Sequence, residues 1–413
     1  QKSLKKLAFI FVYGVLGVWY AKADVSVIHP NEVKTTLERE ENTLSILRFF
    51  IQRLTNDAIQ PDAGMLEENL YYTAECLFRL KAYPQLNIVL NQGRRFAAIQ
   101  NKISPRLQLV EAKYLIEKGV YGRSMEILDD IAEETKDAWL KAEAQLALGD
   151  ILRRKEHWPA SIALYRQVAA TAPDTLLQMR AFNGIGSCYL SGTQFDSAQY
   201  YYKAALQIGL PSLGKSHTRV AQVNYNLGLL ANREGDYYAA EQRFLEALRI
   251  YLQKLGPHHA KTAEVYGALG SVCLLKDDLE KALLYLLKER DILLLLGEET
   301  PDLIYSYLNT GKVYYYQKEW AKAEQALQNS VDMALRFFGK SHQLYLQSIV
   351  EWARVQVEQQ RYGKARVLLE ELVQIHREDP DDYLADVYMQ LGDIAMATGA
   401  DAAAYFRQAN NLY

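Results

Sequence analysis

The sequence LGKSHTRVAQVNYNLGLLANREGDYYAAEQRFLEALRIYLQK, residues 213–254, decides the fold because the segments on either side repeat its layout. It contains a first set of apolar residues at helical spacing: Val220, Val223, Leu227 and Leu230. After Gly235-Asp236 a second such set follows: Ala240, Phe244, Ala247 and Leu248. The stretch therefore predicts a helix, a turn and a second helix, which together form one unit of an array.

A small residue recurs late in each predicted first helix and sets the register of the array. These register residues are Ala74, Ala112, Gly149, Gly186, Gly228, Gly270, Gly311, Ala353 and Gly392. The gaps between them are 38, 37, 37, 42, 42, 41, 42 and 39 residues. Twelve residues after the last seven of them comes a second small residue: Ser161, Ala198, Ala240, Ala282, Ala323, Ala365 and Ala404. Small residues on both helices allow close packing, so the period predicts an all-α solenoid of nine helical hairpins.

The layout of these units resembles the tetratricopeptide repeat (TPR). The resemblance is carried by Leu227, Gly228, Tyr237, Ala240, Phe244 and Ala247 and covers roughly 65–413. From Gly186 onward, units of about 42 residues joined by LGKSH, LGPHH or FGKSH are similar to the kinesin-light-chain variety of the repeat. The resemblance implies a right-handed superhelix of antiparallel helix-turn-helix repeats. The first two units depart most, with Leu86 and Ser124 at the second small position.

The chain divides into four predicted regions. Residues 1–23 resemble a secretory signal peptide, because lysines precede an apolar run from Leu7 to Tyr20 and Ala21-Lys22-Ala23 fits a cleavage site. Residues 24–60 are expected to form a helical lead-in, 65–175 shorter and divergent repeats, and 176–413 the 42-residue repeats. The last unit stops within its predicted second helix, so we expect the polypeptide to continue beyond Tyr413.

The first region bears on where the protein works. A signal peptide predicts export to the periplasm or the membrane surface of a bacterium. A permanent anchor is the weaker alternative, because 14 apolar residues are short for a membrane span. A hydrophobic first helix docked on the array, in a cytoplasmic protein, is the other alternative. Association with a membrane is expected only through this segment or a region after residue 413.

Nothing in the sequence points to catalysis, a cofactor or a metal. The net charge of −3 gives no electrostatic basis for binding nucleic acid. His217, His259 and His342 each lie 11 residues before a register residue, so they occupy equivalent places on different repeats and are not expected to converge on one ion. Each is expected to begin a helix after a left-handed glycine: Gly214, Gly256 and Gly339. Cys76, Cys188 and Cys273 are expected to be small buried residues.

The concave face that this repeat type builds from its first helices is the predicted binding site. Its inward-looking residues are Arg180, Asn183, Gln222, Asn226, Glu264, Ser271, Tyr305, Asn309, Lys312 and Arg354. Asn226 and Asn309 both lie two residues before a register glycine and resemble the asparagines with which such arrays hold an extended peptide backbone. Gly184, Ala268 and Glu351 interrupt this row, so a merely solvated face is the alternative reading.

Tyrosine clusters offer a second source of contacts. In Tyr200-Tyr201-Tyr202 and Tyr314-Tyr315-Tyr316, three consecutive side chains point in different directions on a helix, so at least one of each is expected at the surface.

The sequence therefore predicts a non-catalytic scaffold that binds a protein or peptide segment. The alternative is a sensing arm of a larger bacterial protein, such as a membrane signalling protein or a caspase-like CHAT peptidase, whose output domain follows residue 413. A lone structural adaptor within an assembly makes the same prediction as the scaffold for these residues.

Overall fold

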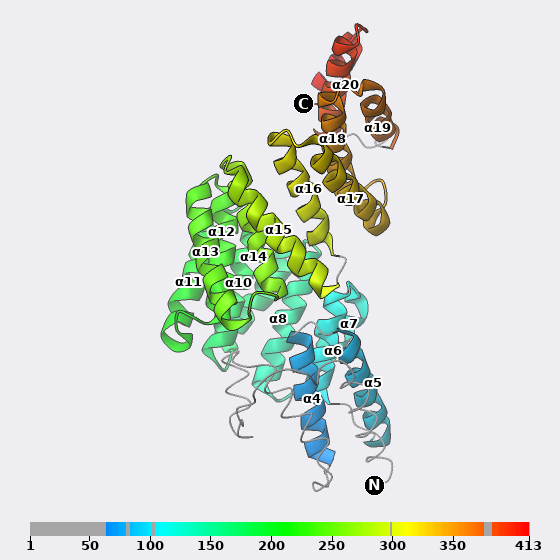
Figure 1. The fold of residues 1–413 in the computed structure, drawn as a ribbon. Helices are drawn as coiled ribbons and strands as arrows, with labels where there is room; N and C mark the ends of the chain where they lie inside the picture. The colour runs from blue at the N-terminus through cyan, green and yellow to red at the C-terminus, as the bar shows by residue number, and fades with distance from the viewer. Residues whose placement is uncertain (1–62, 80–82, 101–103, 298–299, 376–381, 413) are drawn as a thin grey trace. The chain divides into compact units, whose positions relative to one another are not determined.

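The computed structural model describes residues 63–79, 83–100, 104–297, 300–375 and 382–412, which form eighteen α-helices and no strand (Figure 1). The all-α class and the predicted helix-turn-helix pairs are therefore confirmed over these residues. The signal-like segment, residues 1–23, and the predicted lead-in, residues 24–60, lie outside the described residues.

The helices alternate as first and second members of nine hairpins. The first helices are α4 (Ala63–Arg79), α6 (Pro105–Glu117), α8 (Ala138–Arg154), α10 (Thr175–Ser191), α12 (Thr218–Arg233), α14 (Ala260–Leu275), α16 (Pro301–Tyr316), α18 (Gln343–Glu358) and α20 (Asp382–Ala397). The second helices are α5 (Tyr83–Gln100), α7 (Tyr121–Glu134), α9 (Trp158–Thr171), α11 (Phe195–Leu213), α13 (Tyr237–Lys254), α15 (Leu279–Leu296), α17 (Trp320–Phe338), α19 (Tyr362–Ile375) and α21 (Ala403–Asn410).

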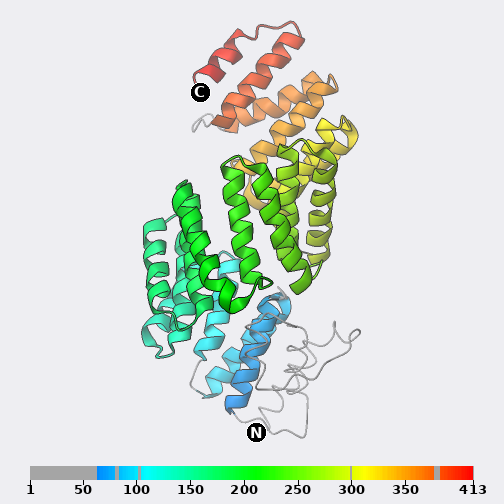
Figure 2. The ribbon, with the colours of Figure 1, turned by 90° about the vertical axis from the view of Figure 1, so that its left-hand side faces the viewer.

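The chain separates into an N-terminal unit, residues 1–230, and a C-terminal unit, residues 231–413, with the division inside α12. In the N-terminal unit α4 packs on α6, α6 on α8 and α8 on α10. In the C-terminal unit α14 packs on α16, α16 on α18 and α18 on α20. Within each unit, then, every first helix also contacts the first helix of the next hairpin, which is the arrangement of a solenoid (Figure 2).

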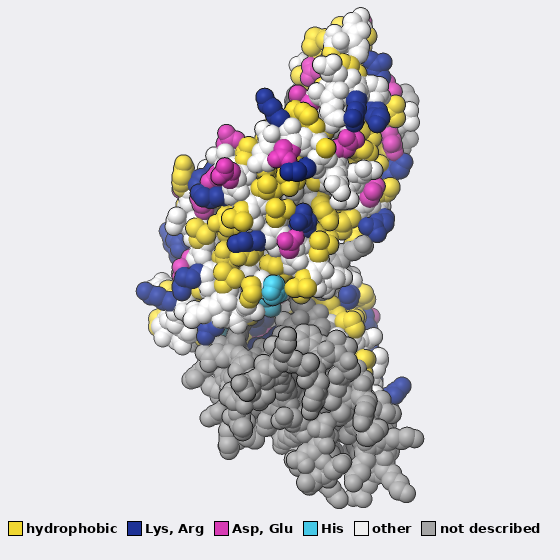
Figure 3. All heavy atoms as spheres, viewed as in Figure 1, with side chains coloured by type: hydrophobic (Ala, Val, Ile, Leu, Met, Phe, Trp, Pro, Cys, Tyr) yellow, Lys and Arg dark blue, Asp and Glu magenta, His cyan; other side chains and the backbone are white. Residues whose placement is uncertain are grey.

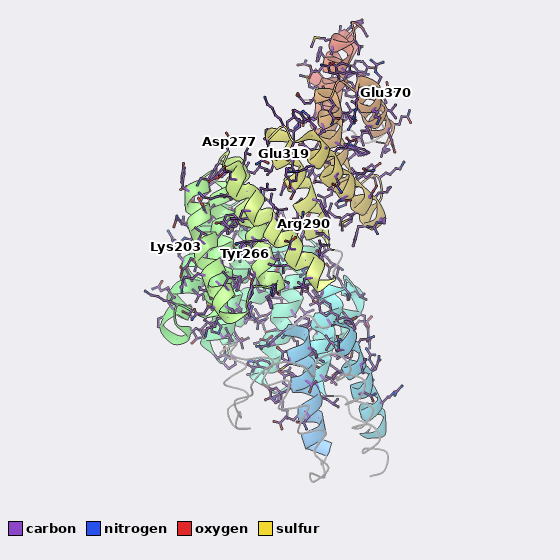
Figure 4. The ribbon with its side chains drawn as sticks, viewed as in Figure 1. Lys203, Tyr266, Asp277, Arg290, Glu319 and Glu370 are labelled. Atoms are coloured by element: carbon purple, nitrogen blue, oxygen red, sulfur yellow. The ribbon has the colours of Figure 1, made fainter. Side chains whose placement is uncertain are left out.

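The turn inside each hairpin has one fixed geometry. Seven residues after the register residue the backbone is left-handed in all eight turns that the structure describes: Gly119, Glu156, Thr193, Gly235, Asp277, Lys318, Gln360 and Gly399. At Asp277, for example, the N–H donates to Leu274 O at 3.1 Å and the next N–H donates to Cys273 O at 2.9 Å. Figure 4 labels Asp277 at this turn. The bonds satisfy carbonyls at the end of the first helix and reverse the chain.

Large side chains of the second helix fill the space that glycines of the first helices leave open, at the register position and, in one case, two residues before it. A Cβ at Gly149 would lie 2.6 Å from Tyr165 Cε1, and a Cβ at Gly184 would lie 2.6 Å from Tyr165 Cζ. The tyrosine ring is therefore held between α8 and α10. Leu327 has the same relation to Gly311, where the distance to its Cγ would be 2.5 Å. These contacts explain why the register position excludes bulk.

Two serines replace alanine at the second small position and bond to the facing helix. Ser161 Oγ donates to Gly149 O at 2.8 Å, and Ser124 Oγ donates to Ala112 O at 2.9 Å. Both serines are fully buried. Because the two bonds are equivalent, they give the divergent unit at Ala112 the same register as its neighbour.

The histidines and cysteines have the structural roles that the sequence predicts. The Nδ1 atoms of His217, His259 and His342 accept hydrogen bonds of 3.1, 3.0 and 3.2 Å from the backbone N–H two residues later, which caps the start of a helix. The preceding glycines are left-handed, as expected: Gly214, Gly256 and Gly339. The three cysteines are buried, and burial raises the pKa of the Cys76 and Cys273 thiols to about 12 and about 11.

Candidate partner-binding face

The ten residues predicted to bind a partner define the first-helix face. Arg180, Asn183, Gln222 and Asn226 belong to α10 and α12 of the N-terminal unit. The C-terminal unit contributes the other six, from α14, α16 and α18: Glu264, Ser271, Tyr305, Asn309, Lys312 and Arg354.

In the N-terminal unit the amides of this face bond to one another. Asn226 Nδ2 donates to Asn183 Oδ1 at 2.8 Å and approaches Ser187 Oγ at 3.4 Å. Gln222 Nε2 lies 3.5 Å from Asn226 Oδ1. Asn226 is only 8% exposed. Its side chain therefore joins α12 to α10, and a bound peptide would reach the edge of this amide network rather than an open asparagine.

An ion triad links three successive first helices of the same unit. Glu143 of α8 is 3% exposed and lies between Lys113 of α6 and Arg180 of α10. Lys113 Nζ is 2.9 Å from Glu143 Oε2, and Arg180 Nη1 donates to Glu143 Oε1. Burial alone would raise the pKa of the Glu143 carboxyl, but the two cations outweigh that effect and hold the pKa well below its usual range.

The C-terminal unit repeats this kind of link with different side chains. Asn309 Nδ2 donates to Ser271 Oγ at 3.2 Å, and Lys312 Nζ is 3.5 Å from Glu351 Oε1. Arg354 Nη1 also donates to Glu351 Oε1, at 3.1 Å. In the Asn309–Ser271 and Glu351–Lys312 contacts, a residue two before one register position contacts a residue one after the preceding register position, as Asn226 contacts Ser187. A ladder of polar contacts therefore runs along the first helices inside each unit.

Some members of the face keep exposed surface for a partner. Tyr305 of α16 is 47% exposed. The side chains of Lys312 and Arg354 are 30% and 39% exposed, and that of Glu264, paired with Lys261 at 2.6 Å, is 32% exposed. An exposed aromatic ring and partly exposed basic and acidic groups are the kinds of side chain that can contact an extended segment.

Sequence reasoning did not single out Lys113, Glu143 or Ser187. A signal for them was present, because Glu143 and Arg180 each lie six residues before a register residue, while Lys113 and Ser187 each follow one directly. Applying the register to the divergent early repeats would have placed them on the same face. The spacing could not predict that Lys113 and Arg180 both pair with Glu143.

The second-helix side also exposes large apolar residues. Tyr200 and Tyr238 are 67% and 75% exposed, and Tyr316, at the end of a first helix, is 55% exposed. The expectation that each tyrosine triplet reaches the surface is therefore confirmed. Over α13 and α15, apolar side chains lie scattered among charged ones (Figure 3). Leu284 and Leu294 of α15 are 50% and 52% exposed.

The described residues contain no group of three or more His, Cys, Asp or Glu side chains placed to hold a metal ion. Nor does any helix of the described segments have the length and apolar character that a membrane crossing requires.

Comparisons with known proteins identify the repeat. The model of the tetratricopeptide repeat family matches residues 219–294 and 302–378. A sequence search of curated proteins gives no match.

Solved structures with the same fold include a signal-transduction ATPase with numerous domains (STAND) from Pyrococcus horikoshii that has a tetratricopeptide repeat sensor. It is 13% identical with a TM-score of 0.64, and the alignment covers 99% of this chain and 62% of that protein. A Rap protein complexed with Competence and Sporulation Factor is 16% identical with a TM-score of 0.55, and the alignment covers 75% of this chain and 85% of that protein.

The apo form of the quorum sensor NprR from B. thuringiensis is 15% identical with a TM-score of 0.50, and the alignment covers 74% of this chain and 97% of that protein. At these identities the similarity concerns the fold. The family match shows tetratricopeptide repeats at residues 219–294 and 302–378, and the other described hairpins share their helix-turn-helix register.

Proposed function

We propose that the chain is a non-catalytic interaction scaffold that binds a protein or peptide segment along its first-helix face. The observation that carries this proposal is the polar ladder of the C-terminal unit, where Ser271, Asn309, Lys312 and Glu351 hold neighbouring first helices together. Exposed Tyr305 lies on the helix that this ladder fixes. A preordered face loses little side-chain entropy on binding.

The Rap protein supports the same assignment, because its structure is a complex with a factor and the fold is shared. The partner expected here is an extended segment that combines hydrogen-bonding backbone with at least one charged side chain. Such a segment would pair its backbone with the amide and hydroxyl groups and its charges with Arg354 or Glu264. Nucleic acid is not the proposed partner, given the net charge of −3.

The test is selection of peptides from a displayed library on the whole chain, followed by affinity measurement. We expect Tyr305→Ala or Arg354→Ala to weaken binding of the selected peptide by about tenfold or more, the usual effect of removing an anchoring contact. Tyr200→Ala is the matched control, since this residue is 67% exposed on a second helix and should change affinity by less than about twofold. Loss of binding in the control, with binding retained in both first-helix variants, would place the site on the other side of the repeats.

A second candidate is the sensing arm of a larger protein. It is favoured by the alignment of 99% of this chain with 62% of a STAND protein that carries a tetratricopeptide repeat sensor. We propose export as part of this candidate, on the evidence of the signal-like residues 1–23. The coding sequence after residue 413 tests it. An α/β pattern with a His and Cys pair would indicate a peptidase, and about 20 apolar residues would indicate a membrane sensor. A stop codon there would reject both.

A further inference from the structure

One buried position of the second helices changes residue type from repeat to repeat, and so does the corresponding position of the next first helix. In four successive second helices the residue 19 positions after the register residue is Ala205, Ala247, Glu289 and Ser330. The corresponding residues of the next first helix are Val223, Val265, Ser306 and Ser348. All eight are buried. The first two pairs are apolar, and the fourth is serine with serine. The third pair, Glu289 with Ser306, combines a carboxyl with a hydroxyl.

The serine pair shows how this position accommodates a polar group. Ser330 Oγ donates to Ile304 O at 3.1 Å and lies 2.7 Å from Ser348 Oγ. Ser348 Oγ also lies 2.8 Å from Leu344 O, and its one hydrogen can be donated either to that carbonyl or to Ser330 Oγ. Both hydroxyls are fully buried, and both have partners within the protein. The junction between α17 and α18 therefore contains a neutral, internally satisfied pair.

Glu289 occupies the equivalent place between α15 and α16, and its surroundings suit a protonated carboxyl. It is 5% exposed, and a Cβ at residue 267 would lie 2.0 Å from its Oε1, so the absence of a side chain at Gly267 leaves it room. Ser306 Oγ donates its hydrogen to Leu286 O at 3.2 Å. The same hydroxyl can instead donate to the Glu289 carboxyl, which partly stabilises the carboxylate, so the burial of Glu289 rather than Ser306 favours the protonated form.

Cations of the two helices of this repeat, α14 and α15, are engaged with other groups. Lys261 of α14 pairs with Glu264, and Lys288 Nζ of α15 lies 5.2 Å from the centre of the Tyr266 ring. Arg290, the next residue of α15, pairs with Asp291 at 2.9 Å. Figure 4 labels Tyr266 and Arg290 on these helices. Within the described residues, no ion pair joins a cation to Glu289.

The anionic groups that face Glu289 are Glu264 from α14 and Asp302 from α16, so both helices packed against α15 oppose a negative charge at this place. Burial, with these two carboxylates adding to it and Ser306 partly offsetting it, raises the pKa of Glu289 to about 8. The folded chain therefore holds this proton at neutral pH.

We propose that Glu289 is a proton-operated joint between the repeat α14–α15 and the repeat α16–α17. When Glu289 is protonated, its side chain stays buried beside Gly267 and the two repeats pack closely. When the proton leaves for solvent, the carboxylate is repelled by Glu264 and Asp302 and lacks a cation, and the packing of α15 against α16 loosens. The joint lies inside the C-terminal unit.

The direction of the pH effect follows from proton binding. An unfolded chain releases this proton near its ordinary pKa of 4.5, whereas the folded chain retains it to about pH 8. Between these values the folded state binds more protons, so stability falls as the pH rises through this interval and levels off above it. Carboxyls with lowered pKa values in this chain, such as Glu143, change stability only below this interval.

The experiment is thermal unfolding of the full chain from pH 5.5 to 9.5, beside Glu289→Gln and the control Glu280→Gln, an exposed residue of the same helix. We expect the melting temperature of the unaltered chain, relative to Glu289→Gln, to fall by about 3 °C or more between pH 5.5 and 8.5. The control should follow the unaltered chain. Parallel curves for the unaltered chain and Glu289→Gln would overturn the proposal.

A second measurement needs no variant and covers the case in which Glu289→Gln folds poorly. Hydrogen exchange of the unaltered chain, corrected for the intrinsic rate, is compared at pH 6.5 and 9. We expect protection in α15 and α16 to decrease by about tenfold at the higher pH, while α18 and α19 change little. Equal changes in both pairs of helices would show that the junction at Glu289 does not respond to its proton.

Discussion

Replacing Tyr165 with alanine is expected to lower the free energy of unfolding around α8, α9 and α10 by about 3–5 kcal/mol, the usual cost of removing a buried aromatic ring. The ring is 1% exposed and fills the space beside two glycines on neighbouring first helices, Gly149 and Gly184. Its loss would leave a cavity shared by two repeats. The backbone of α8 and α10 cannot close this cavity without moving one hairpin relative to the next.

Tyr165→Phe removes only the hydroxyl, so it measures the effect of the hydroxyl separately from that of the ring. Tyr165 Oη donates to Asp150 Oδ1 at 2.6 Å, and the loss of a hydrogen bond to a charged group costs about 1.5–3 kcal/mol. Hydrogen exchange of α8 to α10 measures both variants without assuming that a repeat array unfolds in one step. If the alanine and phenylalanine variants lose equal protection, the hydroxyl rather than the ring joins the repeats.

The period of the sequence was sufficient to predict which faces pack. Gly311 and Ala323 are small in sequence, and the structure places Leu327 against the glycine. The geometry of the turn was less visible. Its left-handed residue is Glu156, Thr193 or Asp277 in different hairpins, and none of these is a glycine that would mark the conformation. The helix-ending bonds around the turn impose it, and those bonds depend on the backbone rather than on residue type.

The register predicted that the ten candidate residues lie on first helices, but the bonds between them could not be predicted. Asn226 and Asn183 are 43 residues apart in sequence and meet only because one repeat stacks on the next. A residue that looks free in a single repeat is thus a partner of its neighbour. Glu289, in contrast, could be recognised from the sequence. It occupies the position that holds Ala205 and Ala247 in earlier repeats, and the register alone reveals this difference.

Replacing Glu143 with alanine is expected to destabilise the N-terminal unit by about 3–5 kcal/mol, because it leaves two largely buried cations without their shared partner. The side chains of Lys113 and Arg180 are 18% and 17% exposed, and both approach the Glu143 carboxylate. Urea denaturation together with hydrogen exchange of α6, α8 and α10 measures the loss. The triple variant Lys113→Met, Glu143→Leu, Arg180→Met is the control, because it removes all three charges and is expected to keep most of the stability.

Acid should reproduce the effect of the single substitution. The two cations hold the pKa of Glu143 well below its ordinary value of 4.5, so its contribution to stability is complete above that value and is lost as the pH falls below it. The stability of the unaltered chain relative to the triple variant should therefore decrease below about pH 4.5. If the two chains lose stability in parallel in acid, the triad does not hold the three first helices together.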